Sequence, residues 1–261
     1  MGKREKLYDF ALASLDLRNK TILDAAVGAG ESTYSWAKRI HEQGGTSEIL
    51  SVDITLSEEW KEKIKTKLGK YSKYVELKEA DIFNLSFLAD KSVDIVNCDD
   101  TLIFLNSKPL QLLPALKEFE RVLRPGGHLI ITSEMPIDSL DDPDNEGQWR
   151  RWNLAKSIHK LKGETWASEP LPNEVTFALE LLGFKVYAEK TFLKSKSFKY
   201  QECMREWKEI MLNEVDDLPW SNHLTDALRK EIYETYNKVM DDGFLMNPAH
   251  YVLKCRKKRR D

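Results

Sequence analysis

A short apolar run that ends in a glycine-rich turn constrains the fold more than any other feature of the chain. Thr21 to Ala26 have the length and composition of a buried strand, and Gly28 and Gly30 follow directly. Glycine removes side chains where a backbone turns tightly or a ligand must approach it closely. A helical pattern over 31–43 comes next, so this segment predicts a strand, a tight turn and a helix in succession.

The alternation of strand and helix continues through the first three quarters of the chain and resumes at its end. Seven runs are predicted to be strands: 21–26, 48–54, 74–78, 92–97, 128–133, 184–193 and 251–255. Helical patterns separate most of them, and Arg124 to Gly127 are predicted to be a sharp turn before the fifth strand. This order predicts an α/β fold with a doubly wound, mostly parallel seven-stranded sheet.

Two stretches, 137–170 and 199–246, interrupt this order. The first begins with an acidic loop, Asp138 to Glu146. Both contain helical patterns, and together the two stretches are rich in aromatic and methionine side chains. No low-complexity linker separates them from the rest. We therefore expect one domain over residues 1–261, with the two stretches inserted as a helical cap.

Composition excludes several classes of protein. Charged residues make up 32% of the chain, yet 40 basic and 43 acidic residues leave a formal net charge of only −3. That balance provides no basic face and disfavours a nucleic acid partner. No apolar run is long enough to span a bilayer. Three widely spaced cysteines predict reduced thiols, and we expect a cytoplasmic protein.

Three acidic residues come at the ends of three successive predicted strands. Asp24 lies at the exit of the first strand, Asp53 ends the second, and Asp81 follows the third. Open α/β sheets bind ligands at the carboxyl edge of their strands, so these carboxylates are expected to line one crevice. An acid in the position of Asp53 suits the two hydroxyls of a ribose, and one in the position of Asp81 suits an exocyclic amine.

A dinucleotide site is the main alternative for a Gly-x-Gly turn. Such a site requires a third small residue where Thr33 stands, and it places a diphosphate at the helix N-terminus. Asp24 and Glu31 would put carboxylates near those phosphates. A ligand with positive charge and no phosphate fits better, and S-adenosylmethionine, with its sulfonium, amino group, ribose and adenine, is such a ligand.

The sequence also resembles class I S-adenosylmethionine-dependent methyltransferases over about residues 20–135. Four motifs in register carry the resemblance: Leu23 to Gly30, Asp53 with Asp81, Val93 to Asp100, and Arg121 to Leu129. The last of these is similar to the small-molecule branch, which includes quinone-biosynthesis methyltransferases. The sequence departs from the family at one position, because the family often has glycine where Ala26 stands.

The resemblance implies a Rossmann-like methyltransferase fold and a set of cofactor-binding residues. The methionine part of the cofactor would be surrounded by Asp24, Ala26, Gly28 and Gly30. Asp53, with Ile54 beside it, would hold the ribose. Asp81 would contact the adenine amine, Ile82 would pack on the ring, and Asp99 would lie beside the sulfonium.

Methyl transfer is an in-line displacement, so the enzyme mainly aligns donor and acceptor and excludes water. A base is needed only if the acceptor loses a proton, and Asp99, Asp100 and Glu134 are the candidates at the strand exits. Each could equally be a structural cap of its strand. His250 precedes the last predicted strand, and no feature of the sequence singles it out. No metal site is expected.

We expect transfer to a small or medium-sized organic acceptor, with S-adenosylhomocysteine as the product and the inserted cap over the acceptor pocket. A methyltransferase acting on a peptide, a protein or RNA is one alternative. A non-catalytic module that keeps the cofactor is another, and a dehydrogenase that binds NADH is a third. The acceptor, the methylated atom and the oligomeric state stay open.

Overall fold

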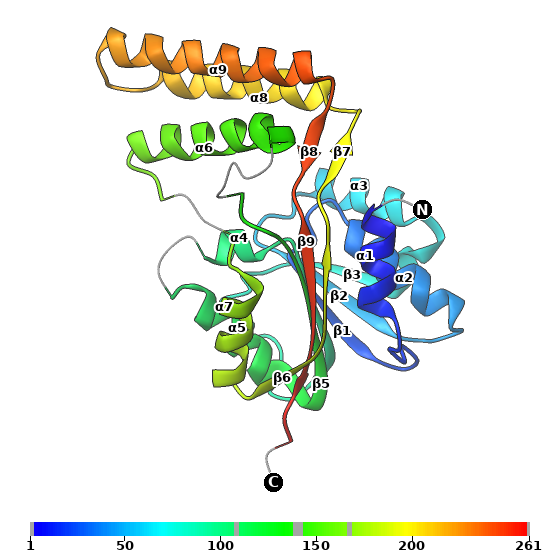
Figure 1. Ribbon diagram of the computed structural model, residues 1–261. Coiled ribbons are helices and arrows are strands. Elements are labelled where there is room, and N and C mark those ends of the chain that lie inside the picture. Colours follow the sequence, from blue (N-terminus) through cyan, green and yellow to red (C-terminus); the bar gives the residue numbers. More distant parts are fainter. Residues whose placement is uncertain (1–2, 107–109, 138–142, 166–168, 260–261) are drawn as a thin grey trace. The chain divides into compact units, whose positions relative to one another are not determined.

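The structure is a computed structural model that describes residues 3–106, 110–137, 143–165 and 169–259 (Figure 1). The chain divides into two compact units. The first comprises Met1–Glu134, Glu169–Phe192 and His250–Asp261, and the second comprises Met135–Ser168 and Leu193–Ala249. Within the described ranges, no helix is both long and apolar enough to cross a lipid bilayer.

A seven-stranded sheet forms the centre of the first unit. Its strands are β1 (Thr21–Ala25), β2 (Glu48–Asp53), β3 (Val75–Glu79), β4 (Val93–Asp99), β5 (Leu123–Glu134), β6 (Phe184–Phe192) and β9 (His250–Lys257). Their order across the sheet is β3-β2-β1-β4-β5-β9-β6, and β9 runs antiparallel to both of its neighbours. The predicted doubly wound, mostly parallel sheet is confirmed.

Helices cover both faces of this sheet. They are α1 (Lys3–Leu12), α2 (Glu31–Glu42), α3 (Glu58–Leu68), α4 (Leu102–Leu105), α5 (Leu112–Val122) and α7 (Pro172–Leu181), with a 3₁₀ turn at Gly69–Tyr74. Figure 1 shows α1, α2 and α3 on one side of the sheet and α5 and α7 on the other. One core cluster joins Leu7 of α1 and Trp36 of α2 to Ile22, Ile95 and Val252 of the sheet. Strands covered on both faces read as unbroken apolar runs, which explains why β1 was recognisable in the sequence.

The start of β5 differs from the prediction. The strand begins at Leu123 rather than at residue 128, so Arg124 to Gly127 are part of the strand and do not form a separate turn. Val93 pairs with Leu123 whereas Ile95 pairs with His128, so β5 carries extra residues that bulge out of the ladder. Gly126 has a φ of 83°, and this left-handed residue bends the strand without ending it.

The second unit is a helical bundle with a two-stranded sheet. Its elements are a 3₁₀ turn at Pro143–Asn145, α6 (Glu146–Leu161), β7 (Ser195–Ser197), α8 (Gln201–Asp216), α9 (Asn222–Asp242) and β8 (Leu245–Asn247). The pairing of β7 with β8 was not predicted. Met204, Trp207 and Met211 of α8 are buried in the core of this bundle, so these three side chains serve packing. Of the predicted acidic loop, residues 138–142 lie outside the described residues.

Candidate active site

A cavity of about 600 Å³ opens at the carboxyl edge of the sheet in the first unit. Its volume lies within the range of roughly 300–1,000 Å³ that is usual for small-molecule and cofactor sites. The wall is formed by the turn after β1, the ends of β2, β3 and β4, the short helix α4 and the first turn of α1. The lining residues are Arg4, Ala26, Val27, Gly28, Ala29, Glu31, Ser32, Asp53, Ile54, Ala80, Asp81, Ile82, Phe83, Asp99, Asp100, Thr101, Phe104 and Leu105.

The glycine-rich turn presents bare backbone to this cavity. Val27 donates a backbone hydrogen bond of 2.8 Å to Val52, which holds the turn against β2. Gly28 has a φ of 47°, and a Cβ added there would meet no protein atom within 4 Å. Ala26 also lies in the left-handed region, with a φ of 64°. The position where the family often has glycine therefore has the backbone conformation that favours glycine.

Asp24 does not line the cavity. Strand register places it directly beside Ser51 of β2 and Asn97 of β4, and its side chain is fully buried. Its carboxylate accepts hydrogen bonds from Asn97 Nδ2 (2.7 Å), from the hydroxyls of Ser51 and Ser32 (3.3 Å each), and from the hydroxyl of Thr33. Burial raises the pKa of Asp24, and the four donors oppose that shift.

The carboxylate of Asp24 therefore ties the start of α2 to three strands, which is the role of a loop-stabilising acid. Its predicted contact with the methionine part of the cofactor stays a prediction. Gly30, the residue before α2, likewise lies outside the cavity wall.

The acids after β2 and β3 do face the cavity. Asp53 Oδ2 accepts a hydrogen bond of 2.9 Å from the Gly28 amide, and Asp81 Oδ1 accepts one of 2.9 Å from the Phe83 amide. Each of these interactions leaves the second carboxylate oxygen for a ligand. Ile54 and Phe104 also line the cavity, and they are 68% and 72% exposed. Large apolar side chains that stand exposed beside a cavity provide surfaces on which a flat ring can pack.

Helix α1 contributes two residues that sequence reasoning missed. The hydroxyl of Tyr8 donates a hydrogen bond of 2.6 Å to Asp99 Oδ2, and Arg4 forms an ion pair with Asp100. Thr132 of β5 donates to the other oxygen of Asp99. No motif in the sequence marks these two residues, because their partners are more than 90 positions away along the chain.

Two adjacent acids at the end of β4, Asp99 and Asp100, have pKa values shifted in opposite directions. Burial raises the pKa of Asp99 to about 7, and the negative charge of Asp100 adds to the shift. Burial also acts to raise the pKa of Asp100, but His250 and Arg4 hold it below its ordinary value. Asp100 has a φ of 46°, so its backbone is strained where β4 ends.

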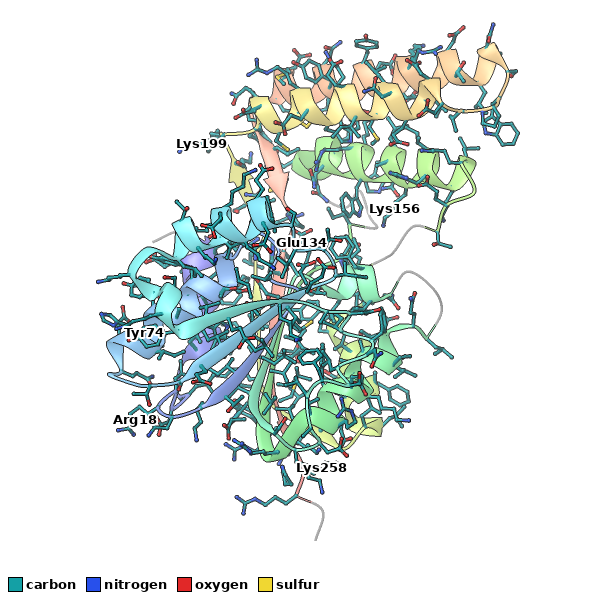
Figure 2. The ribbon with its side chains drawn as sticks, turned by 180° about the vertical axis from the view of Figure 1, so that it is seen from behind. Arg18, Tyr74, Glu134, Lys156, Lys199 and Lys258 are labelled. Atoms are coloured by element: carbon teal, nitrogen blue, oxygen red, sulfur yellow. The ribbon has the colours of Figure 1, made fainter. Side chains whose placement is uncertain are left out.

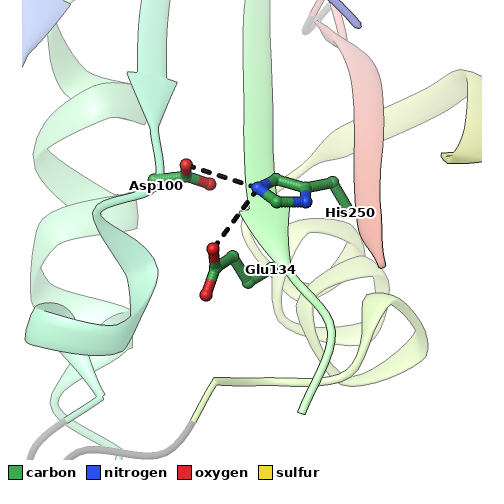
Figure 3. Close-up of side chains that lie close together, drawn as sticks. All are labelled: Asp100, Glu134 and His250. Atoms are coloured by element: carbon green, nitrogen blue, oxygen red, sulfur yellow. Dashed lines mark ion pairs between the residues drawn. The ribbon is translucent and has the colours of Figure 1, made fainter. Parts of the chain in front are cut away.

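A histidine that the sequence did not single out completes this edge of the sheet. His250 Nε2 lies 3.6 Å from Asp100 Oδ2 and 3.5 Å from Glu134 Oε1 (Figure 3). Glu134, labelled in Figure 2, ends β5, and His250 begins the neighbouring strand β9. Asp100 also lines the cavity, whereas Glu134 and His250 do not. The three side chains are of types that bind metal ions and lie within 4.8 Å of one another, but the ion pair from Arg4 already compensates part of their negative charge.

Comparison with known proteins gives a consistent result. Residues 23–131 match the family model described as "Methyltransferase domain". This segment is a methyltransferase domain. No curated protein sequence matches the chain.

Solved structures agree with the methyltransferase fold. A protein of Bacillus halodurans C-125 named as a proposed methyltransferase is 19% identical, with 99% of this chain and 100% of that chain covered and a TM-score of 0.62. A protein of Methanosarcina mazei described as a SAM-dependent methyltransferase is 15% identical, with 100% and 99% covered and a TM-score of 0.56. The [4+2]-cyclase SpnF is 17% identical, with 98% and 81% covered and a TM-score of 0.57. These matches do not select the quinone-biosynthesis branch.

The charge of its cavity distinguishes this methyltransferase domain from a dinucleotide-binding domain. Among the described residues, five carboxyl groups line the wall, from Glu31, Asp53, Asp81, Asp99 and Asp100, against one guanidinium, that of Arg4. A diphosphate would meet repulsion from these groups, whereas a cation would be attracted.

Proposed function

We propose that the protein transfers a methyl group from S-adenosylmethionine to a small or medium-sized organic acceptor. The observation that carries this proposal is the cavity at the sheet edge, which is lined by the bare backbone of Gly28 and by the carboxylates of Asp53, Asp81 and Asp99. The methyltransferase domain over residues 23–131 supports the same assignment.

The residues of the wall match the chemical parts of the cofactor. Asp53 holds the ribose hydroxyls, since it lines the cavity and only one of its oxygens accepts the hydrogen bond from Gly28. Asp81 takes the exocyclic amine of adenine, and Ile82 packs on the ring. Asp99 lies beside the sulfonium, and the turn from Ala26 to Gly28 borders the methionine part.

When bound, S-adenosylmethionine supplies a methyl carbon that is already activated by the positive sulfur. The protein binds and orients the acceptor so that its attacking atom is in line with the carbon–sulfur bond. Such alignment lowers a barrier by roughly 7–11 kcal/mol. Apolar wall residues such as Phe104 and Leu105 exclude water from the reacting groups.

Two other functions remain as competitors. A peptide, protein or RNA acceptor would use the same cofactor site, although a net charge of −3 gives no general attraction for RNA. The similarity to a [4+2]-cyclase indicates that this fold does not by itself determine the reaction. A non-catalytic module would bind the cofactor and transfer nothing.

Calorimetric titration with S-adenosylmethionine, S-adenosylhomocysteine and NADH tests the cofactor. We expect saturable binding of the first two and none of NADH. Incubation with methyl-labelled cofactor and a panel of organic compounds then separates an enzyme from a binding module. Binding of NADH alone would contradict the proposal, and so would an absence of any binding.

A further inference from the structure

We infer that the acceptor is an amine, which is bound in its ammonium form by Asp100, Glu134 and His250. This inference rests on the proposed function and adds the chemical class of the acceptor. The three residues come from the exit of β4, the end of β5 and the start of β9, which lie side by side in the sheet.

The spacing of the three groups suits a shared ligand. The distances of 3.6 and 3.5 Å from His250 Nε2 to the two carboxylates exceed the usual 2.7–3.2 Å of a hydrogen bond with nitrogen. All three ligand atoms nevertheless lie within 4.8 Å of one another. A nitrogen atom above this triangle can reach all three at about 2.9 Å. An ammonium group offers three N–H donors to the three acceptors, and an alcohol offers only one donor.

Asp100 connects the cluster to the cavity of the first unit, whereas His250 Nε2 is buried. Asp100 lines the cavity, and its Oδ2 lies 3.6 Å from His250 Nε2. The side chain of Glu134 is 34% exposed, so the cluster is not sealed. Asp100 Oδ1 is buried and has no hydrogen-bond partner within the described part of the chain. It therefore keeps an unused capacity to accept a hydrogen bond.

The electrostatics of the cluster favour a cation. Acids surround it from several elements, and the charged and titratable groups that act on it are Lys3, Arg4, Tyr8, Asp99, Asp100, Glu134 and Glu169. Of the four carboxyl groups, Asp100 and Glu134 belong to the cluster and two lie outside it. Arg4 and Lys3 are the cations, and burial lowers the pKa of Lys3. Burial raises the pKa of Glu134, and the charges of Asp100 and Glu169 act in the same direction. A bound ammonium relieves this repulsion, whereas a neutral alcohol does not.

The same arrangement provides a base. A protonated amine has no lone pair, so it must lose a proton before it can attack the methyl carbon. Neutral His250 accepts that proton at Nε2, and the carboxylates of Asp100 and Glu134 stabilise the imidazolium. The lone pair that is freed on the nitrogen forms the new N–C bond as the C–S bond breaks. The electrons of the C–S bond stay on sulfur. The ammonium group thereby becomes an N-methylated ammonium product, the sulfonium becomes a neutral thioether, and His250 becomes an imidazolium.

A binding experiment tests this inference without knowledge of the natural acceptor. Protein with ¹³C-labelled histidine is saturated with S-adenosylhomocysteine and titrated with methylammonium chloride or with methanol, with NMR detection of the imidazole signals. His250, assigned from the spectrum of His250→Asn, should shift saturably with methylammonium and not with methanol. His159, which pairs with Glu164 in the second unit, is the internal control and should not move.

Glu134→Gln should weaken the methylammonium response at least tenfold while S-adenosylhomocysteine binding stays unchanged. An absence of a saturable shift, or an equal shift with methanol, would overturn the inference. If the unaltered protein does not bind S-adenosylhomocysteine, the proposed function itself is refuted. The two failures are therefore distinguishable.

Methyl transfer from labelled cofactor provides a second test, with pairs of amines and alcohols that share one carbon skeleton, such as benzylamine and benzyl alcohol. We expect label in the amines. His250→Asn should lower that rate by roughly 100- to 10,000-fold, whereas His159→Asn should leave it unchanged. Label in the alcohols alone would overturn the inference.

Loss of activity with a chelator and its recovery with Mn²⁺ would also overturn it, because the cluster would then be a metal site.

Discussion

The backbone amide of Gly28 donates a hydrogen bond of 2.9 Å to Asp53 Oδ2, which joins the glycine-rich turn after β1 to the end of β2. The carboxylate that is expected to hold the ribose thus also sets the position of the turn that borders the methionine part. Trp60 reinforces the link, since its indole Nε1 donates to the Gly28 carbonyl at 3.0 Å. Changes at this pair should therefore affect binding of the cofactor before they affect stability.

Asp53→Asn should lower the affinity for S-adenosylmethionine roughly tenfold or more. The amide oxygen can still accept from Gly28, so the turn is kept, but the charge-assisted hydrogen bond to the ribose is lost. Calorimetric titration measures the change. Asp16→Asn, which alters an exposed acid paired with Arg18, is the matched control and should leave the affinity unchanged. Equal affinities for the Asp53 variant and the unaltered protein would contradict the assignment.

Asp24→Asn should destabilise the first unit by about 1–3 kcal/mol. The buried carboxylate accepts from four donors, and an amide in its place turns one acceptor into a donor that faces them. Urea unfolding measures the free energy. If the variant unfolded like the unaltered protein and lost only cofactor affinity, Asp24 would be a ligand-contacting residue instead.

Ala26→Gly should not reduce stability, although alanine-to-glycine changes usually do. The left-handed conformation costs alanine about 1–2 kcal/mol, and glycine is free of this cost. The resulting gain on substitution offsets the greater conformational freedom of glycine in the unfolded chain. The cofactor can also approach the backbone more closely, so its affinity should be equal or higher. Ala37→Gly, inside α2, is the control and should lose about 1 kcal/mol or more. A comparable loss for both variants would show that residue 26 is unstrained.

The pH dependence of stability should reveal Asp99. Its pKa of about 7 in the folded protein exceeds its ordinary value of 3.8, so folding favours the protonated form. The contribution of Asp99 is complete below pH 3.8 and is lost as the pH rises through about 7. Between pH 5 and 8 the loss amounts to roughly 2–3 kcal/mol. Urea unfolding of Asp99→Asn, which resembles the neutral acid, should give a flatter profile. Parallel profiles for the two proteins would be inconsistent with this pKa.

The cap role of residues 137–170 and 199–246 remains a prediction. If these stretches close over the acceptor, hydrogen exchange in α8 and α9 should slow when S-adenosylhomocysteine and an acceptor are added. Mass spectrometry of the exchanged peptides provides the measurement. Exchange rates in segment 199–246 that do not respond to ligand would remove the basis for a lid.

Much of the first unit was predictable because its signals are local. Buried parallel strands are continuous apolar runs, helices show their own period, and the turn at Gly28 needs a residue type that few other positions require. The seven strands and the helix after the glycine-rich turn were therefore recognised, whereas the short helix α4 was not. The early start of β5 was missed because a bulge depends on pairing with β4, which the sequence of one strand does not contain.

The side-chain partners at the strand exits depended on the tertiary structure. Asp24 was expected at the cavity, but parallel pairing places it between Ser51 and Asn97, residues 27 and 73 positions away, where its carboxylate is enclosed. His250 reaches Asp100 only because β9 inserts beside β5. By itself the sequence determined which elements form and where the acids stand along them. Strand order and register, which arise from contacts between distant segments, decided which of those acids meet each other and which face the ligand.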